Sequence, residues 1–511
     1  MTVQDQVPDA TQSDRLRKSS LDKDLGKIER LEEATRTVTR DLITPGIALL
    51  FLALAGIFAS FQVGANSSAA LVIAAAVIGG YMALTIGAND VANNVSPAVG
   101  ARALTMTGAL VIAAIFESAG ALIAGGDVVE TISKGIVDPT AVKDREVFIW
   151  VMMSALLSSA LWVHLATWLG APVSTTHAIV GGVLGAAVAA LGAASIDWWV
   201  IGAIAASWVV SPLLGGIVAA LLLAFIKVNV IYQDDKIAAA RRWVPVLIAI
   251  MTATFACYLV LKGLGRIWKP GALVVGGLTM AIYAVTYAAA RPYIVRQSEG
   301  LENRNQSLRK LFHMPLIMSA ALLSFAHGAN DVANAVGPLA AIIQSAEVGA
   351  VGKKVDLPFW IMLIGALGIS LGLLLYGPRL IRLVGEQITK MNPMRAYCVA
   401  LSAALTVIVA SWLGLPVSST HIAVGAIFGV GFFREYYTTH SARRQKYVKK
   451  HRPRHAVRHL TPSDQEELRR RKLVRRSHFT TIIAAWVITV PAAAGMAAAM
   501  YYAVAKLHLG H

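Results

Sequence analysis

A run of seven residues that contains a carboxylate and two amides occurs twice in this chain. Gly87–Asn93 returns 241 positions later as Gly328–Asn334, with all seven residues identical. Both copies lie in or at the end of a long apolar stretch, where every polar group needs a partner. A pair of helix caps would not require a copy of seven residues. The repeat therefore predicts an ion or substrate site, formed by Asn89, Asp90, Asn93, Asn330, Asp331 and Asn334.

Carboxylate, amide and carbonyl oxygens are ligands for a hard monovalent cation. Gly87 and Gly328 are expected to let the backbone unwind and present its carbonyls. The two copies differ just outside the repeat, because Ala335 stands where the first copy has Asn94, and His327 stands in place of Ile86. The two sites are therefore not expected to be identical, and no metal other than sodium is expected.

A second repeated motif follows each copy of the first. Residues 166–177 match residues 410–421, and both end in Pro-Val-Ser-(Thr/Ser)-Thr-His. Gly170 ends one predicted helix and Pro172 suits the first turn of the next. The start of a helix carries unpaired N–H groups and a partial positive charge, which together bind anions. The hydroxyls in these turns are therefore candidate ligands for an anionic substrate: Ser174, Thr175, Thr176, Ser418, Ser419 and Thr420.

The doubled pair of motifs resembles the PiT family of inorganic phosphate transporters, over about residues 71–502. The resemblance implies a cation-coupled phosphate permease in which the aspartates hold the coupling ion and the hydroxyl motif binds phosphate. The residues themselves support a symporter, because two anionic sites would balance the charge of a doubly negative phosphate. The ion gradient across the membrane would then drive uptake by alternating access around a central site. Sodium and protons both remain open as the driving ion.

Composition places the chain in a membrane. Its 511 residues are 56% hydrophobic and 15% charged, with a mean hydropathy of +0.61, whereas soluble domains carry about 25% charged residues. The net charge of +17 could suggest nucleic-acid binding, but residues 434–476 hold fifteen Lys/Arg against four Asp/Glu. A basic loop between apolar segments is a topology signal and attracts anionic lipid. We therefore expect an all-α, multi-pass protein of the cell (inner) membrane that does not bind nucleic acid.

The chain divides into five predicted parts. They are a disordered cytoplasmic tail (1–41), an additional transmembrane helix (42–63), a first repeat (69–227), connecting helices with a basic linker (228–314), and a second repeat (315–506) that includes the basic cytoplasmic loop 434–476. Placing the basic loops in the cytoplasm puts the N-terminus inside and leaves seven crossings between Asp90 and Asp331. An odd number makes the halves inverted repeats, with their Pro-Val-Ser-Thr hairpins meeting at a central site.

Several alternatives remain at this stage. Glu117 lies in an apolar span and could act as a proton or cation relay, or pair with a neighbouring helix. Sulfate or a metal–phosphate complex could replace phosphate as substrate. A membrane hydrolase using Asp90, His177 and Asp331 is disfavoured, because an enzyme needs one asymmetric catalytic set and not a doubled one. We therefore expect no enzyme activity and no cofactor apart from the coupling ion, and the sequence is compatible with a homodimer.

Overall fold

The computed structural model describes residues 42–63, 68–137, 142, 144–171, 173–263, 270–348, 357–387, 391–451 and 476–506. These residues form helices and contain no sheet, only an isolated bridge between Val137 and Ile196. The chain divides into two units, residues 1–51 and 52–511, and all packing described below lies within the second. Eleven described helices are long and apolar enough to cross a membrane. The predicted all-α membrane fold is confirmed, whereas the predicted tail lies outside the described residues.

The helices of each part of the chain have the following bounds. After helix Leu42–Gln62, the first half contains α3 (Ala69–Asn89), α4 (Ala92–Gly100), α5 (Met106–Ala124), α6 (Gly126–Glu130), α7 (Arg145–Trp168), α8 (Thr175–Leu191) and α9 (Trp198–Ile226). The connecting part contains α10 (Lys236–Lys262), α11 (Ala272–Gln297) and α12 (Asn305–Leu311). The second half contains α13 (His313–Val348), α14 (Phe359–Gln387), α15 (Pro393–Trp412), α16 (Ser419–His440), α17 (Ala442–His451) and α19 (Arg476–Val504). Short π-helical turns, Thr131–Gly135 and Lys227–Ile231, extend α6 and α9.

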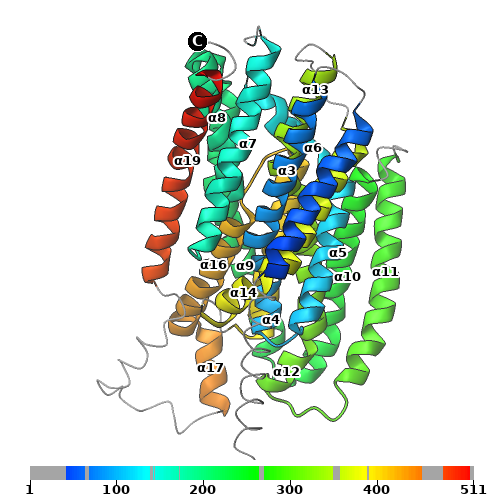
Figure 1. Ribbon diagram of the computed structural model, residues 1–511. Helices are drawn as coiled ribbons and strands as arrows, with labels where there is room; N and C mark the ends of the chain where they lie inside the picture. Colours follow the sequence, from blue (N-terminus) through cyan, green and yellow to red (C-terminus); the bar gives the residue numbers. More distant parts are fainter. Residues whose placement is uncertain are drawn as a thin grey trace, which may run out of the picture. The chain divides into compact units, whose positions relative to one another are not determined.

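Each half packs its helices against those of the other half. The first-half helix α3 lies on α14, and α13 lies on α5; likewise α8 lies on α19, and α16 on α9 (Figure 1). Glycines make these contacts close, since a Cβ at Gly185 would collide with the backbone of Ala494 and one at Gly429 with that of Gly216. Small residues at helix contacts are typical of membrane proteins, where packing replaces the hydrophobic effect. The matching pairs agree with a repeated architecture, and the opposite orientation of the halves stays a prediction.

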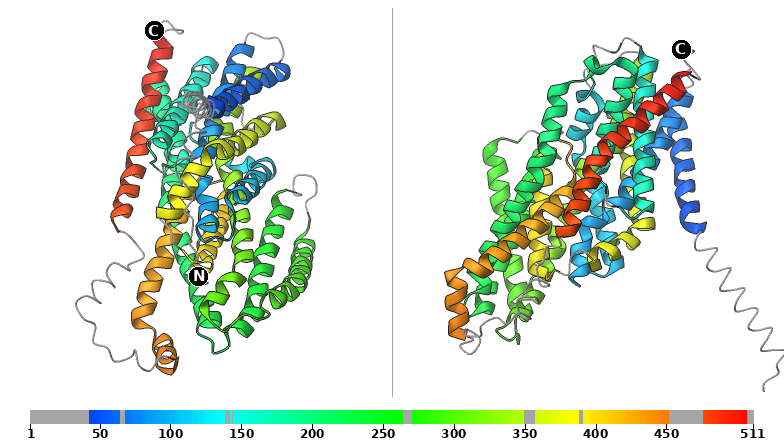
Figure 2. Two further views of the ribbon diagram at one scale, coloured as in Figure 1. Left: turned by 60° about the horizontal axis from the view of Figure 1, so that its bottom comes forward. Right: turned by 90° about the vertical axis from the view of Figure 1, so that its left-hand side faces the viewer.

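Helix α13 forms the centre of the second unit. It carries the second cation motif and is buried along most of its length, and it contacts α3, α5, α7 and α15. By contrast, α11 buries only Val275 and Ile294 and lies at the opposite edge from α19 (Figures 1 and 2). Polar residues on α13 are therefore removed from both water and lipid by the surrounding helices.

Candidate transport site

The first copy of the cation motif lies at a break between two helices. Helix α3 ends at Asn89 and α4 begins at Ala92, so that Asp90, only 2% exposed, lies in the joint. The second copy lies within α13, which continues unbroken through Gly328. The expectation that Gly328 unwinds the backbone is therefore wrong. Both glycines permit close packing instead, because a Cβ at Gly87 or Gly328 would collide with a carbonyl oxygen of α14 or α5, respectively.

Both hydroxyl motifs form the buried start of a helix, as predicted. The preceding helices, α7 and α15, end at Trp168 and Trp412. Each is followed two residues later by a glycine, Gly170 or Gly414, whose positive φ angles of 70° and 68° suit glycine. Ser174 then caps α8 by accepting a hydrogen bond from the backbone N–H of His177 at 3.1 Å, and Ser418 caps α16 in the same way at 3.3 Å. Two of the six predicted substrate hydroxyls therefore already serve as helix caps. Pro172 lies outside the described residues.

The first asparagine of each cation motif ties its helix to the nearby hairpin. Asn89 hydrogen-bonds the hydroxyl of Thr167 at 2.8 Å, and Asn330 donates to that of Ser411 at 2.9 Å. Asn330 also accepts from the backbone N–H of Val417 at 3.2 Å. Thr167 and Ser411 occupy matching positions in the repeat. The two amides therefore position the hairpin of their own half, a role that the sequence did not indicate.

The second asparagine of each motif reaches the hairpin of the other half. Asn93 donates to the hydroxyl of Thr420 at 2.9 Å, whereas Asn334 donates to those of Thr175 and Thr176, each at 3.2 Å. These contacts bridge more than 150 residues along the chain. They join the two predicted site motifs into one cluster at the contact between the halves.

Asp90 connects the two kinds of motif directly. The hydroxyl of Thr175 donates to its Oδ2 at 2.7 Å, and that of Thr420 lies 3.4 Å from its Oδ1. One carboxylate is thus held by a hydroxyl from each hairpin, although the hairpins belong to different halves. The predicted cation ligand and the predicted phosphate ligands touch, so what binds to Asp90 must affect the threonine hydroxyls.

Asp331 has a different set of partners from Asp90. Its Oδ2 lies 2.7 Å from Nε2 of His327, whose Nδ1 lies 2.8 Å from Oε2 of Glu117. The other Glu117 oxygen accepts from Asn94 at 2.8 Å. Asn94, Glu117, His327 and Asp331 therefore form one buried polar chain across α4, α5 and α13. Glu117 pairs with neighbouring helices, which was one of its two predicted roles.

Three buried oxygen atoms of the site have no hydrogen-bond partner among the described residues. They are Oδ1 of Asp331, Oδ1 of Asn334 and Oγ of Ser419. In addition, Asp90, His327 and Asp331 each offer a ligand atom within 4.8 Å of the others. Unpaired buried oxygens are costly unless a ligand satisfies them. The carboxyl oxygen of Asp331 and the amide oxygen of Asn334 are suited to bind a cation, and the hydroxyl of Ser419 is suited to bind an anion.

Comparison with known proteins places this geometry among transporters. The family model described as "Phosphate transporter family" matches residues 86–497, which include every candidate site residue. A protein of Helicobacter pylori named "Putative phosphate permease" is 50% identical over 424 residues, which are 82% of this chain and 80% of that protein. A Pyrococcus abyssi protein with a name of the same kind is 39% identical over 367 residues, or 70% and 88% of the two chains.

A solved structure resembles most of this chain. "The sodium-dependent phosphate transporter" matches with a TM-score of 0.76 and 34% identity, over 86% of this chain and 100% of that chain. The family and the relatives are permeases and not enzymes. The expectation of no enzyme activity is thus confirmed, and the membrane hydrolase is set aside.

Proposed function

Because the chain belongs to the phosphate transporter family, we propose that it is a symporter that couples phosphate uptake to sodium entry. Phosphate transport and a multi-pass location in a membrane follow from the family and the eleven candidate spans. The coupling, its ion and the alternating-access cycle are the parts proposed here. So are the location in the cell (inner) membrane and the cytoplasmic N-terminus, which rest on the distribution of basic loops.

The observation that carries the proposal is the contact of Asp90 with Thr175 and Thr420. Each hydroxyl has one proton to donate, either to Asp90 or to an oxygen of phosphate. A cation bound to Asp90 would replace the hydroxyl donors at the carboxylate and free them for the anion. Cation binding would thereby create donors for phosphate at the buried starts of α8 and α16. This exchange gives coupling a physical cause within one cluster.

The charges of the site favour a cation before an anion. Asp90, Asp331 and Glu117 bring three carboxylates, and His327 can offset only one of them. Within the part of the chain that the structure describes, no Lys or Arg forms an ion pair with these three carboxylates. A phosphate that enters an acidic buried site without cations would meet repulsion that the low polarity of the surroundings strengthens. We infer that cations bind first and phosphate second.

Two facts support sodium over protons. The unpaired oxygens of Asp331 and Asn334 are ligands suited to a hard cation. In addition, a structural relative that aligns over all of its length is named for sodium dependence. The paired packing of α3 on α14 and α13 on α5 supports alternating access, since each half could exchange conformation with its counterpart.

Labelled-phosphate uptake into proteoliposomes tests the proposal. A sodium gradient and a pH gradient are imposed in separate experiments, with sulfate as the competitor. We expect the inward sodium gradient alone to drive accumulation, and sulfate to compete poorly. Accumulation driven by the pH gradient without sodium would replace sodium by protons. A requirement for a divalent metal would instead favour a metal–phosphate complex as substrate, and strong inhibition by sulfate would show a general oxyanion site.

A further inference from the structure

One tryptophan of α9 contacts the hairpins of both halves. The indole of Trp208 lies against the imidazole of His177, with 3.8 Å between the ring centres. Its Nε1 donates a hydrogen bond to the backbone carbonyl of Pro416 at 3.1 Å. His177 ends the hydroxyl motif of the first half, and Pro416 belongs to that of the second half. A single side chain outside both motifs therefore links them.

Three successive carbonyls of the second hairpin accept hydrogen bonds from three different helices. The carbonyl of Leu415 accepts from Asn330 of α13, and that of Val417 accepts from the hydroxyl of Thr176 in α8, each at 3.1 Å. The carbonyl between them is the one that accepts from Trp208. Because a carbonyl that is buried without a donor is costly, these three bonds fix the backbone that leads into α16. Trp208 supplies the middle donor.

The rings of Trp208, His177 and His421 form a row that we call the aromatic stack. The two imidazoles meet edge to face, with ring centres 4.4 Å apart and an angle of 87° between the rings. Both histidines are buried, and the backbone N–H of each donates to the serine that caps its own helix. The imidazoles thus directly follow the candidate substrate hydroxyls of α8 and α16. A shift of one hairpin relative to the other must displace a ring of the stack.

The aromatic stack joins helices that otherwise pack on different partners. Within the described part of the chain, α8 packs against α7, α13 and α19, whereas α16 packs against α4, α9 and α15. Helices α9 and α16 are in close backbone contact, since a Cβ at Gly425 or Gly429 would collide with the carbonyl of Pro212 or Gly216, respectively. Trp208 therefore extends from the α9–α16 pair to the hairpin that begins α8. Its loss should loosen the two hairpins relative to each other without separating either helix from its main partner.

We propose that Trp208 is a positioning residue for phosphate binding, which holds the two hairpins in the register in which their hydroxyls meet one anion. This rests on the proposed function, in which hydroxyls of both halves donate to the same phosphate. Hydrogen bonds weaken steeply when donor and acceptor are misaligned, so two separate helix starts bind one anion tightly only if their relative position is fixed. Trp208 does not itself bind phosphate. It acts through His177 and through the carbonyl of Pro416.

The test uses the full-length protein in two assays, phosphate uptake into proteoliposomes and thermal unfolding with sodium or inorganic phosphate added. Trp208→Phe keeps an aromatic face for His177 and removes the donor to Pro416, whereas Trp208→Leu removes both contacts. We expect the KM for phosphate to rise about two- to tenfold in Trp208→Phe and at least about tenfold in Trp208→Leu. The stabilisation that phosphate gives should weaken in the same order. The kcat, and the sodium concentration that gives half-maximal stabilisation without phosphate, should stay within about twofold of wild type.

Two control variants lie on the same helix. Trp199 is 87% exposed, so Trp199→Leu removes an indole of α9 that does not reach the hairpins and should keep the wild-type KM.

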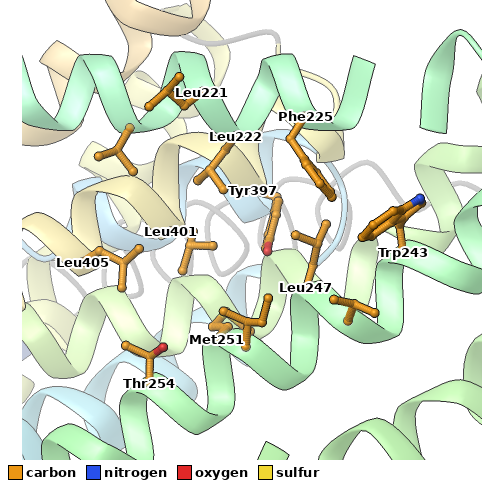
Figure 3. A pocket seen from close by; sticks show the side chains of 13 residues that line it. Leu221, Leu222, Phe225, Trp243, Leu247, Met251, Thr254, Tyr397, Leu401 and Leu405 are labelled. Carbon is orange, nitrogen blue, oxygen red and sulfur yellow. The ribbon is translucent and has the colours of Figure 1, made fainter. Parts of the chain in front are cut away.

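The second control weakens the packing of α9 away from the hairpins. An apolar groove of about 380 Å³ lies between α9, α10 and α15, and the side chain of Leu222 points into it (Figure 3). At 1.5 Å per residue, Leu222 lies about 20 Å from Trp208 along the helix. Leu222→Ala should lower the unfolding midpoint and leave the KM for phosphate within about twofold of wild type. It therefore separates a loss of packing from a loss of hairpin register.

Three outcomes would overturn the proposal. One is a Trp208→Leu protein with wild-type KM and wild-type stabilisation by phosphate; if this variant fails to fold, the same result in Trp208→Phe decides. Another is an equal rise in KM in Leu222→Ala, since any weakening of α9 would then act alike. The third is a lower kcat with unaltered KM, which would place the aromatic stack in the conformational cycle and not in binding. Wild-type protein that accumulates no phosphate on a sodium gradient would contradict the proposed function instead, and stabilisation by phosphate would still test the hairpin register.

Discussion

The hydroxyl of Ser118 lies 2.7 Å from the hydroxyl of Ser370, the residue that occupies its place in the other half of the chain. These two serines are 252 residues apart, and the same offset relates Gly120 to Gly372. The two glycines pack on the carbonyls of Phe325 and Leu84, respectively. His177 and His421 form a second pair of counterparts, with ring centres 4.4 Å apart. Residues that meet their own counterparts are the pattern expected of two halves related by an approximate twofold axis.

This close contact predicts that Gly120 and Gly372 tolerate no side chain. A Cβ at either position would collide with a backbone carbonyl, which cannot move as a flexible side chain can. We expect Gly120→Ala and Gly372→Ala each to destabilise the protein by about 1–3 kcal/mol or more, as overpacking does. The measurement is the thermal unfolding midpoint of the detergent-solubilised protein.

Gly276→Ala provides the matched control for that experiment. Gly276 lies within α11, and an added Cβ would meet no atom within 4 Å. Alanine also favours helix over glycine, so this variant should be neutral or slightly more stable. Equal midpoints for Gly120→Ala, Gly372→Ala and Gly276→Ala would show that the halves separate freely at this contact.

The adjacent serines of the second hairpin are predicted to have different roles. Ser418 caps α16, whereas the hydroxyl of Ser419 is buried without a partner among the described residues. Ser418→Ala should therefore lower stability by about 0.5–2 kcal/mol. Ser419→Ala should leave the unfolding midpoint near wild type but weaken phosphate binding at least about tenfold, because a donor to the anion is lost.

Phosphate-dependent thermal shifts and uptake kinetics separate these two effects. A Ser419→Ala variant with wild-type phosphate affinity would remove Ser419 from the substrate site. A Ser418→Ala variant of wild-type stability but weakened affinity would show that the cap hydroxyl turns to the substrate instead.

The repeated motifs allowed most of the site to be predicted from the sequence. Asn89–Asn93 and Asn330–Asn334 do converge with the Ser/Thr motifs, because identical segments in a duplicated chain adopt equivalent positions. The break between α3 and α4 and the unbroken α13 could not be predicted, since the seven residues are the same in both. The surrounding helices decide that difference. The role of the glycines was also misjudged, because a close carbonyl on another helix leaves no trace in the local sequence.

The polar chain from Asn94 to Asp331 was missed for a related reason. Three of its four members break the repeat: the counterparts of Asn94, Glu117 and His327 are Ala335, Ile369 and Ile86. The sequence shows each exception separately and does not show that the three are in contact. A set of simultaneous departures from the repeat was the available signal. The two aspartates consequently have different surroundings, one held by hydroxyls and the other by an imidazole.

This asymmetry predicts that substitutions within the buried polar chain have strongly non-additive effects on stability. Glu117→Ile alone removes the buried partner of Asn94 and of Nδ1 of His327, which should cost about 3–5 kcal/mol. The triple variant Asn94→Ala, Glu117→Ile and His327→Ile copies the apolar set of the other half and should cost less than the sum of the single changes. Thermal or denaturant unfolding of all four variants measures this coupling. Additive losses would show that the three side chains act independently despite their contacts.

Asp90 and Asp331 should both be required for sodium coupling, although they lie 241 residues apart. Asp90→Asn and Asp331→Asn preserve size and remove one negative charge each, so each should abolish or flatten the dependence of uptake on sodium. Phosphate should still bind, but about 5- to 150-fold more weakly, because linkage makes the loss reciprocal. Asp127→Asn is the matched control, since the Asp127 side chain pairs with Lys262 and contacts none of the candidate cation ligands, so this variant should retain wild-type sodium dependence.

The surroundings of the two aspartates make the prediction sharper. Asp90→Asn weakens the acceptor of Thr175 and Thr420, so it should release these hydroxyls and lessen the advantage that sodium gives to phosphate binding. Asp331→Asn weakens the partner of His327 instead and should also lower the unfolding midpoint. Uptake is measured against sodium concentration at fixed pH, and then against pH without sodium. A variant at either position that keeps full uptake with its sodium dependence intact would leave that aspartate outside the coupling mechanism.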